Sequence, residues 1–479
     1  MQVRLAPLAC LAMLCGCTAG PDFHEPAPIA DASYTPGSQP LGTVAAQGAG
    51  GEAQRLVPVA SLGGSWWRAF GCAELDELVR EALASSPSLT EASMRLAQAR
   101  QDYAAQAGAS EWPQVSGTAN VTREKVNPAA FGIGNLLGNR TFPPFTLYEA
   151  QVSVSYTLDL AGANRRTLEG LAAQIDYERY QLEAARLTLA GNVVTAAIRR
   201  ASLAAQLALS ERLLGAQEQQ LAISEQRLRA GGIAEAELLS ERTQVEQTRA
   251  LLPPLRIQLA QADHQLSVYL GHTPAQGTPP LPQLDALRLP TELPLTMPAR
   301  LAWQRPDVRA SQALLHQASA NVGVATANLY PQITLSGGFG PDGTALSNLV
   351  DVWSIGAGLT QPLFRGGQLR ARKRSAEDAY EAAAASYRQT VLQALEQVAD
   401  ALRAIEQDAI ELQARDRAQE EAQASARVAS DRYAAGGVSE LALIDAQRQQ
   451  LQTTLDRTQV QAQRLSDTAA LYQALGAAP

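Results

Sequence analysis

The chain has 479 residues, a formal net charge of −8 and an aromatic content of only 5%. Stretches rich in Ala, Gln, Leu, Arg and Glu are typical of long packed helices, so the composition favours an elongated domain over a compact core. The acidic balance, without a concentrated basic face, argues against nucleic acid as a partner.

The N-terminus has the pattern of a lipoprotein signal. A basic residue precedes an apolar run over residues 5–14 that is too short to span a bilayer as a helix, which indicates a secretory signal. Residues 14–17, LCGC, resemble the bacterial lipobox, which implies cleavage after residue 16 and a lipid on Cys17. Cys15 departs from the usual Ala, Ser or Thr, so an unlipidated secreted form is the alternative. Thr18, rather than an aspartate, follows Cys17, which implies sorting to the outer membrane.

Residues 17–64 are rich in Pro, Gly, Ala and Ser without an apolar period, which predicts an extended, weakly structured, lipid-anchored strap. After lipidation and removal of the signal, Cys72 would be the one free thiol, so no disulfide framework is expected. No histidine lies near Cys72 in the sequence, and we interpret it as a small buried residue rather than a nucleophile.

Long helices are predicted next. A helical segment over 75–107, broken near Pro87, precedes two proline-free runs over residues 164–251 and 363–478. A single helix over 164–229 would be about 100 Å long at ~1.5 Å per residue. Apolar spacings of four and three in the second run predict long antiparallel hairpins, with an ordinary amphipathic core helix as the alternative. The apolar residues are Val391, Leu395, Val398, Leu402, Ile405, Ala409 and Leu412.

Short stretches that alternate between apolar and polar residues predict strands. The four stretches are about 115–122, 151–159, 333–340 and 353–363. The second stretch is apolar on one face and polar on the other, which fits a transmembrane strand of ~9 to 11 residues with its polar face toward a lumen. Its apolar residues are Val152, Val154, Tyr156 and Leu158.

The chain is an internal duplication. RLRAGGIAEAELLSERT begins at Arg227 and RYAAGGVSELALIDAQR begins at Arg432, 432 − 227 = 205 positions later. YTLDLAGANRR falls on QPLFRGGQLRA at the same offset, 361 − 156 = 205, and EWPQV falls on LYPQI at 329 − 111 = 218. The predicted parts are a signal peptide (1–16), the strap (17–64), a first repeat (65–272), a Pro-rich linker (273–298) and a second repeat (299–479).

Each glycine pair predicts a turn between two helices. Arg227 and Arg432 lie in the last turn of the preceding helix, where a positive charge complements the helix dipole. A glycine that follows can take the left-handed conformation that ends a helix. Tip turns are therefore expected at about 230–234 and 435–439, and this structural role by itself needs no function.

The predicted strands require more than one chain. Four strands cannot close a membrane barrel, and an open sheet edge is not tolerated in lipid. Closure must come from other copies, so two chains would give eight strands and three chains would give twelve.

The segments CTAGPDF, SWWRAFG, YTLDLAGANRR and LYPQI and the doubled Arg-x-x-Ala-Gly-Gly turns resemble TolC-type outer-membrane efflux channels, in their NodT-like and OprM-like lipoprotein branch. The resemblance implies a mainly α-helical homotrimer with a twelve-stranded β-barrel in the outer membrane and a twelve-helix periplasmic tube. It implies a passive exit duct for drugs and other small molecules, of the kind that contributes to multidrug resistance. The implied partners are a periplasmic adaptor and an inner-membrane pump of the resistance-nodulation-division type.

The resemblance also implies roles for residues at the tips. Tyr433 and Glu237 fall where a tyrosine and an acid of neighbouring hairpins form a closing hydrogen bond, and Asp445 falls where the family carries a ring of acids facing the lumen. Val438 departs from the pattern, because some members have an arginine there. The residues expected to contact the adaptor are Arg227, Gly231, Gly232, Arg432, Gly436 and Gly437.

No enzyme, cofactor or metal site is expected. The histidines at 24, 264, 272 and 316 show no metal-ligand spacing, and no G-x-S-x-G motif is present. The alternative function is a lipid-anchored periplasmic coiled-coil spacer without a pore. The four alternating stretches distinguish the two functions, because a spacer would not need them.

Overall fold

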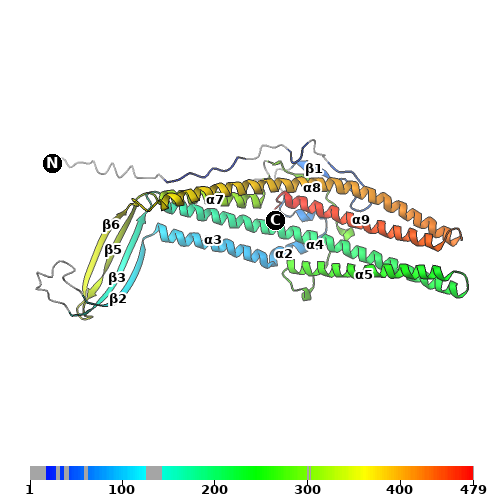
Figure 1. Ribbon diagram of the computed structural model, residues 1–479, viewed down its shortest axis with the longest axis horizontal. Coiled ribbons are helices and arrows are strands. Elements are labelled where there is room, and N and C mark those ends of the chain that lie inside the picture. The colour runs from blue at the N-terminus through cyan, green and yellow to red at the C-terminus, as the bar shows by residue number, and fades with distance from the viewer. Residues whose placement is uncertain are drawn as a thin grey trace. The chain divides into compact units, whose positions relative to one another are not determined.

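The computed structural model of the chain describes residues 18–27, 33–36, 42–58, 63–125, 143–298, 301 and 304–477, so the signal peptide and the proposed lipidation site Cys17 lie outside the described residues. The main helices (Figure 1) are α2 (Ala73–Ser85), α3 (Pro87–Glu111), α4 (Ala163–Arg229), α5 (Glu235–Tyr269), α7 (Pro306–Ala327), α8 (Gln368–Ala434) and α9 (Glu440–Ala474). Within the part of the chain that is described, no helix has both the length and the apolar character needed to cross a membrane.

The strands form two separate sheets. The strands are β1 (Arg55–Pro58), β2 (Gln114–Glu124), β3 (Phe145–Leu158), β4 (Glu292–Leu295), β5 (Gln332–Gly343) and β6 (Val350–Thr360). The larger sheet has the order β2-β3-β5-β6 and is antiparallel throughout. The four predicted strands and the long helices are thus confirmed, and every strand is longer than expected except the last, which ends at Thr360.

Two compact units make up the chain, and each draws residues from both sequence repeats. Helices α3, α4, α7 and α8 contribute residues to both units, so the repeats are units of duplication rather than of folding. Among the described residues, the first unit contains those up to Glu25, Leu96–Tyr177 and Ser311–Ser386, and the second contains Pro26–Arg95, Glu178–Ala310 and Tyr387–Pro479.

In the second unit, α4 and α5 form one antiparallel hairpin. Three ion pairs join the helices at intervals of seven residues, with the arginine on α5 and the glutamate on α4. The pairs are Arg242–Glu225 (2.7 Å), Arg249–Glu218 (2.7 Å) and Arg256–Glu211 (2.8 Å). Exposed pairs of this kind each stabilise a protein by ~1 kcal/mol or less, so their importance lies in fixing the register. Apolar contacts of Leu214, Val245 and Leu252 supply the core of the hairpin.

Helix α5 continues beyond the proline-free run and passes through Pro253 and Pro254 to Tyr269. A proline cannot donate the backbone hydrogen bond that an interior helical position makes to the residue four positions earlier. Both prolines and the residues at 249 and 250 lie on the exposed side, where water can satisfy the freed carbonyl groups.

The seam of α8 differs in one respect from the expected one. Val391, Val398, Ile405 and Leu412 are buried at a seven-residue spacing as predicted, whereas Leu395 and Leu402 are only partly buried. The intervening buried positions are alanines, at 394 and 401, because a small side chain lets a packed helix approach closely.

The strap makes more ordered contacts with the rest of the chain than its composition predicts. β1 in the strap pairs in parallel with β4 in the Pro-rich linker, with Arg55 opposite Glu292. Arg464 of α9 is completely buried, and its guanidinium donates to the carbonyl oxygens of Gly50 (2.7 Å) and Glu52 (2.8 Å). A buried guanidinium needs such acceptors, so the strap carbonyls and Arg464 stabilise one another.

A cluster of buried aromatic residues follows the strap. Trp66, Trp67 and Phe70 are buried, and Trp66 stacks on Tyr472 of α9 with ring centroids 5.3 Å apart. Cys72 is also buried, as predicted, and burial raises the pKa of its thiol. A raised pKa opposes formation of the thiolate, which is the nucleophilic form.

Asp408 of α8 is half-buried and lies beside Asp467 of α9. Burial raises the pKa of Asp408 to about 8, with the neighbouring Asp467 acting in the same direction and Arg464 acting against it. The seven-residue pattern places Asp408 three residues after Ile405, at the position equivalent to the buried alanines, which explains why this carboxyl group is desolvated.

We predict that Asp408→Asn removes a pH dependence of stability. The pKa of Asp408 is higher in the folded chain than in the unfolded chain, so the wild type loses stability as the pH rises from about 4 to about 8. Thermal unfolding measured across this range should show the asparagine variant more stable by about 1 kcal/mol or more at the upper end. Asp400→Asn, an exposed acid on the same helix, is the control, and parallel pH curves for wild type and Asp408→Asn would contradict the prediction.

Candidate functional site

The two tip turns have the same backbone geometry. Gly231 has a φ of 75° and Gly436 a φ of 74°. The next glycine in each turn donates its N–H to a carbonyl five residues earlier, from Gly232 to Arg227 and from Gly437 to Arg432, both at 2.7 Å. This combination is the Schellman motif, which satisfies the last carbonyl groups of a helix. The sequence pattern and the local backbone therefore agree at both tips.

The two glycines of each pair differ in what they require. A side chain at Gly231 or Gly436 would be strained because of the left-handed φ. At Gly232 and Gly437 the φ is ordinary, and an added Cβ would lie 3.4 Å and 3.5 Å from the nearest carbonyl oxygen. The fold of this chain thus requires only the first glycine of each pair, and the second leaves room for an approaching surface.

The helices that follow the tip turns, α5 and α9, have different N-caps. The Oγ of Ser439 accepts a hydrogen bond from the Ala442 N–H at 3.4 Å, so α9 has a side-chain cap. Ala234 at the start of α5 offers no cap, and Glu235 and Glu237 place negative charge in the first turn instead. Both solutions stabilise the positive end of a helix dipole.

Tyr433 links the two hairpins through Arg227. The Arg227 guanidinium on α4 donates to the Tyr433 hydroxyl on α8 at 3.0 Å, with its Cζ 5.8 Å from the ring centroid. Glu237 is exposed, and within the described part of this chain no hydrogen bond joins it to Tyr433. A Tyr433–Glu237 bond between neighbouring copies stays a prediction. The motif did not identify Arg227 as the partner of Tyr433, because that contact depends on how the hairpins pack.

Two buried glutamates lie just inside the tips and were missed by the sequence analysis. Glu241 of α5 and Glu440 of α9 are 4% and 3% exposed. Ser224 of α4 donates to Glu440 at 3.3 Å, and Ser224 and Gln220 also lie beside the carboxylate of Glu241. Burial raises the pKa of Glu241, and the charge of Arg227 opposes this rise. The available signal was the apolar stripe of α5, because Glu241 falls between Leu238 and Val245 at helical spacing.

Asp445 lies on an exposed surface of α9. Its carboxylate is 62% exposed and lies 3.8 Å from the Arg448 guanidinium one turn later. Such an exposed pair is weak, which leaves the carboxylate available to solvent. An acid in this position contributes negative charge to whichever space the surface faces.

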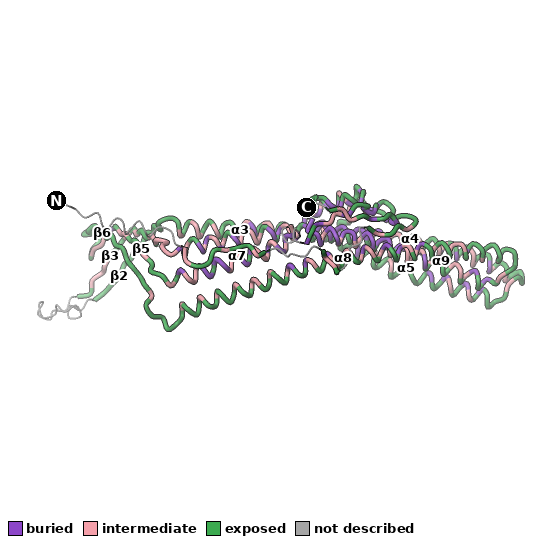
Figure 2. Tube along the Cα trace, turned by 90° about the horizontal axis from the view of Figure 1, so that it is seen from above, coloured by how far each residue is buried: buried purple, intermediate pink, exposed green. Residues whose placement is uncertain are grey.

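The larger sheet is amphipathic in every strand. In the register, Val152 lies opposite Phe339, and Phe339 lies opposite Trp353, so one face is continuously apolar. This face is exposed, with Ile355 at 84% and Trp353 at 74%, and Figure 2 shows most of the sheet as exposed or intermediate. The opposite face is polar, with hydrogen bonds between Ser and Ser or Thr and Thr across the strands. β2 and β6 form the two open edges.

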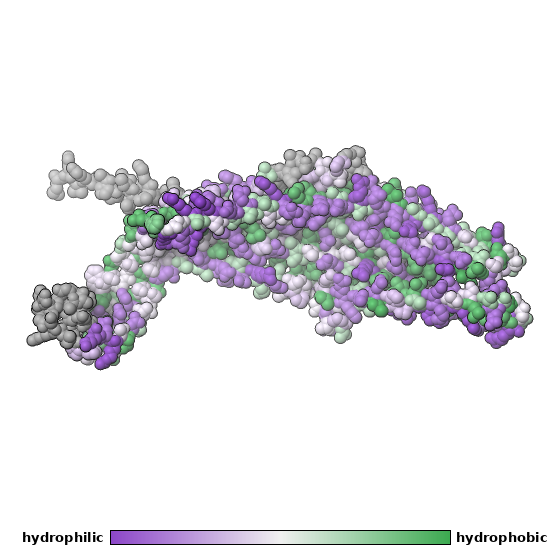
Figure 3. All heavy atoms as spheres, viewed as in Figure 1, coloured by the Kyte–Doolittle hydropathy of each residue, from purple (hydrophilic) through white to green (hydrophobic). Residues whose placement is uncertain are grey.

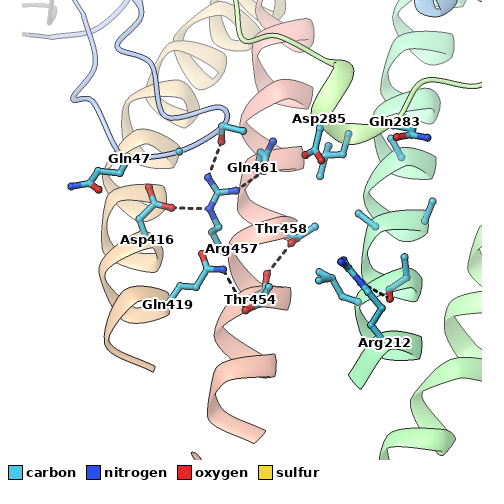
Figure 4. Close-up of a pocket in the computed structure, with 18 of the residues that line it drawn as sticks. Gln47, Arg212, Gln283, Asp285, Asp416, Gln419, Thr454, Arg457, Thr458 and Gln461 are labelled. Carbon is cyan, nitrogen blue, oxygen red and sulfur yellow. Dashed lines mark hydrogen bonds and ion pairs between the residues drawn. The ribbon is translucent and has the colours of Figure 1, made fainter. Parts of the chain in front are cut away.

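A polar cavity of about 840 Å³ lies between α4, α8 and α9 in the second unit. Figure 4 shows Arg457 on its wall, where it contacts Asp416 (2.8 Å) and Gln461 (2.6 Å) and also donates to the Ala49 carbonyl of the strap (2.9 Å). These contacts fix the strap to the helices. In the described ranges of the chain, no group of three His, Cys, Asp or Glu side chains could hold a metal ion.

A sheet with one exposed apolar face, in the same chain as two helical hairpins with matching tips, is typical of a subunit of a membrane channel. The family model described as "Outer membrane efflux protein" matches residues 78–272 and 298–477. The chain belongs to the outer membrane efflux protein family.

Relatives and solved structures agree with this membership. The chain is 32% identical over 416 residues to the pyoverdine export outer membrane protein OpmQ of Pseudomonas putida, which covers 86% of this chain and 87% of OpmQ. It is 27% identical to the toluene efflux pump outer membrane protein TtgI of Pseudomonas putida, over 99% of this chain and 98% of TtgI. The structure of the outer-membrane channel OprN superposes with a TM-score of 0.84 and 29% identity, over 96% of this chain and 99% of OprN.

The protein is therefore an outer-membrane component of an efflux system, and it conducts transport passively rather than catalysing a reaction. The predicted family, the mainly helical fold class and the outer-membrane location are confirmed. The non-conducting spacer gains no support from the family match or from the relatives.

We predict that alanine destabilises the tip turn at Gly436 but not at Gly437. Gly436→Ala should destabilise the turn by about 1 kcal/mol because a left-handed φ is unfavourable for alanine. Gly437→Ala should leave the turn unchanged, since its φ is ordinary and its Cβ has space. Hydrogen exchange of the amides around the tip checks both, with faster exchange expected only for Gly436→Ala. Equal exchange in the two variants would contradict the assignment.

Proposed function

We propose that three copies of the chain form a passive duct through the outer membrane, in which the sheets close a barrel and the hairpins form a periplasmic tube. The tips dock to a periplasmic adaptor, which connects the duct to an inner-membrane pump that supplies the energy. A lipid on Cys17, with the preceding signal removed, anchors each copy.

The exposed apolar face of the sheet, together with its two open edges, carries this proposal. Side chains such as Ile355 and Trp353 are exposed in a single chain, and contact with lipid would remove them from water. The open edges at β2 and β6 require partners because unpaired backbone groups are costly in lipid. Pairing β2 of one copy with β6 of the next satisfies both demands.

The tips suit a gate and a docking surface. The Tyr433–Arg227 link holds the two hairpins of one copy together, and Tyr433 with Glu237 of a neighbouring copy would join the copies. Three Asp445 side chains around the axis would form a ring that attracts cations. The six adaptor-contact positions, Arg227, Gly231, Gly232, Arg432, Gly436 and Gly437, lie in or beside the turns, and all six are exposed.

A wide polar duct also fits the range of cargo named for the relatives. OpmQ is named for pyoverdine export and TtgI for toluene efflux, two molecules of very different size and polarity. We infer that the cargo of this chain is a small molecule selected by the pump rather than by the duct.

A matched pair of substitutions on β6 tests membrane insertion. Ile355→Arg places a charge on the apolar face, which costs about 2–4 kcal/mol at the middle of a bilayer, whereas Ser354→Arg places it on the polar face. Wild type and Ser354→Arg should form heat-modifiable trimers that give single-channel steps in planar bilayers, and Ile355→Arg should give none. A silent wild type would support the spacer, and conduction by both variants would refute the assignment of the faces.

Two substitutions at the tip should separate the gate from the acidic ring. Tyr433→Phe removes the acceptor of the Arg227 bond and should favour the open tip by up to about fivefold, seen as higher mean conductance. Asp445→Asn should reduce cation selectivity, seen as a smaller reversal potential in a salt gradient, without the increase in conductance. Each variant is the control of the other, and unchanged conductance in Tyr433→Phe or an unchanged reversal potential in Asp445→Asn would refute its assigned role.

A further inference from the structure

The segment after β6 combines exposed apolar side chains with a dense positive charge. Leu363 and Phe364 are 92% and 89% exposed. The basic residues that follow are Arg365, Arg370, Arg372, Lys373 and Arg374, and no acid occurs before Glu377. Figure 3 shows a strongly hydrophilic patch over the start of α8 beside a hydrophobic one near the end of β6. The expectation of no concentrated basic face, drawn from the overall charge of −8, was therefore wrong.

This charge opposes the helix it belongs to. The N-terminus of a helix carries partial positive charge, so basic residues there are unfavourable, and α8 has no acid in its first turn to compensate. Basic residues that destabilise the N-terminus of α8 are expected to gain a compensating interaction with another group.

The first repeat provides an internal comparison at the offset of 205 positions. Asp159 caps α4 by accepting from the backbone N–H groups of Asn164 (3.1 Å) and Arg165 (2.9 Å). Its counterpart in the second repeat is Phe364, since 159 + 205 = 364, and the counterpart of Glu169 is Arg374, since 169 + 205 = 374. The second repeat has therefore replaced two acids by an apolar residue and a base.

The arginines of the two repeats also differ in their partners. Arg166 at the start of α4 pairs with Asp22 and Glu169, each at 2.7 Å. Lys373 pairs with Glu377 at 3.1 Å. Four exposed arginines of this segment, Arg365, Arg370, Arg372 and Arg374, make no ion pair or side-chain hydrogen bond within the described ranges.

A cavity of about 310 Å³ lies at the same place, between the end of α7, the sheet and α8. Arg365 and Arg372 line it, together with the side-chain amides of Asn321, Asn328 and Gln332. Guanidinium and amide N–H groups are donors that suit phosphate oxygens. The cavity thus offers charge and donors to an anion, and the exposed Leu363 and Phe364 lie in the same segment.

We propose that a junction patch after β6 binds an anionic phospholipid of the membrane leaflet at the end of the sheet that adjoins α8. The junction patch consists of Leu363, Phe364, Arg365, Arg370, Arg372 and Arg374. Arg365 and Arg372 hold the phosphate, and the acyl chains lie along Leu363, Phe364 and the apolar face that includes Leu359, itself 68% exposed. A basic cluster directly beside a membrane-spanning element attracts anionic lipid. The proposal rests on the proposed function, because it requires the sheet to span the membrane.

Lipid retention by the purified full-length protein tests the proposal. Detergent-solubilised trimers are incubated with equal amounts of phosphatidylglycerol and phosphatidylethanolamine, and the retained lipids are counted by native mass spectrometry. Wild type should retain phosphatidylglycerol preferentially. In the double variant Arg365→Gln with Arg372→Gln, the ratio of retained phosphatidylglycerol to phosphatidylethanolamine should fall by about fivefold per arginine removed. Phe364→Asp, which restores the acid of the first repeat, should also lose it. Arg417→Gln with Arg427→Gln, two exposed arginines further along α8, is the matched control and should behave as wild type.

The other outcomes overturn the proposal in distinguishable ways. Equal retention of the two lipids by a wild type that still conducts would reject the lipid site and leave the proposed function standing. Displacement of the lipid by an equal concentration of free glycerol 3-phosphate would show a phosphate site without lipid specificity. Loss of the trimer in Arg365→Gln with Arg372→Gln would identify a second copy as the occupant. A wild type that neither trimerises nor conducts would reject the proposed function itself.

Discussion

The unpaired edges of the four-stranded sheet are the constraint on which the rest of the molecule depends. Its apolar face favours hydrocarbon, while the backbone groups along β2 and β6 cannot enter hydrocarbon without hydrogen-bond partners. A single chain cannot meet both conditions, and a closed ring of chains can. The number of chains in that ring then sets how many hairpins surround the aqueous extension. In the proposed assembly, the closure of the sheet in the membrane therefore fixes the number of copies at the tips as well.

Much of this architecture is readable from local pattern. Alternation in residues such as Val152 and Val154 predicts a two-faced strand, and the doubled glycine phrase predicts helix ends whose left-handed residues are Gly231 and Gly436. These features depend on residues close together in the sequence. The same holds for the seven-residue burial of Val391 and its successors in α8.

The features that the sequence did not predict depend on distant segments. The partner of Tyr433 is Arg227, which comes from the other hairpin, and the strand pair β1–β4 joins residues 292 − 55 = 237 positions apart. Glu241 is buried and Asp408 is half-buried, whereas composition alone predicts that both acids are exposed. For Asp408 the alanines at 394 and 401 of the same seam explain the low exposure, since an alanine-rich contact leaves little water between helices. Overall charge was equally uninformative, because averaging concealed the cluster after β6.

The two sequence repeats carry matching strand pairs, long helices and tip turns, and they differ where their surroundings differ. The turn glycines are shared because the same backbone must reverse direction twice. Tyr433 and Asp445 correspond to Leu228 and Ser240 in the first repeat, since 433 − 205 = 228 and 445 − 205 = 240. Asp159 and Phe364 show the same divergence at the other end of the helices. Identity between the copies therefore indicates backbone geometry, and difference indicates contact with distinct neighbours.

The hydrogen bonds from Arg464 to the strap carbonyls affect the order in which the chain folds. Its acceptor Gly50 lies 414 positions earlier, and the acceptor Glu52 lies 412 positions earlier, whereas the pairs within each hairpin are closed over far fewer residues. Contacts between distant residues form slowly because the intervening chain loses entropy when the loop closes. The hairpins can form while synthesis and export proceed, but the strap acquires its last partner only when α9 has arrived. The strap therefore acquires its full set of contacts only once α9 is present, although it lies near the start of the chain.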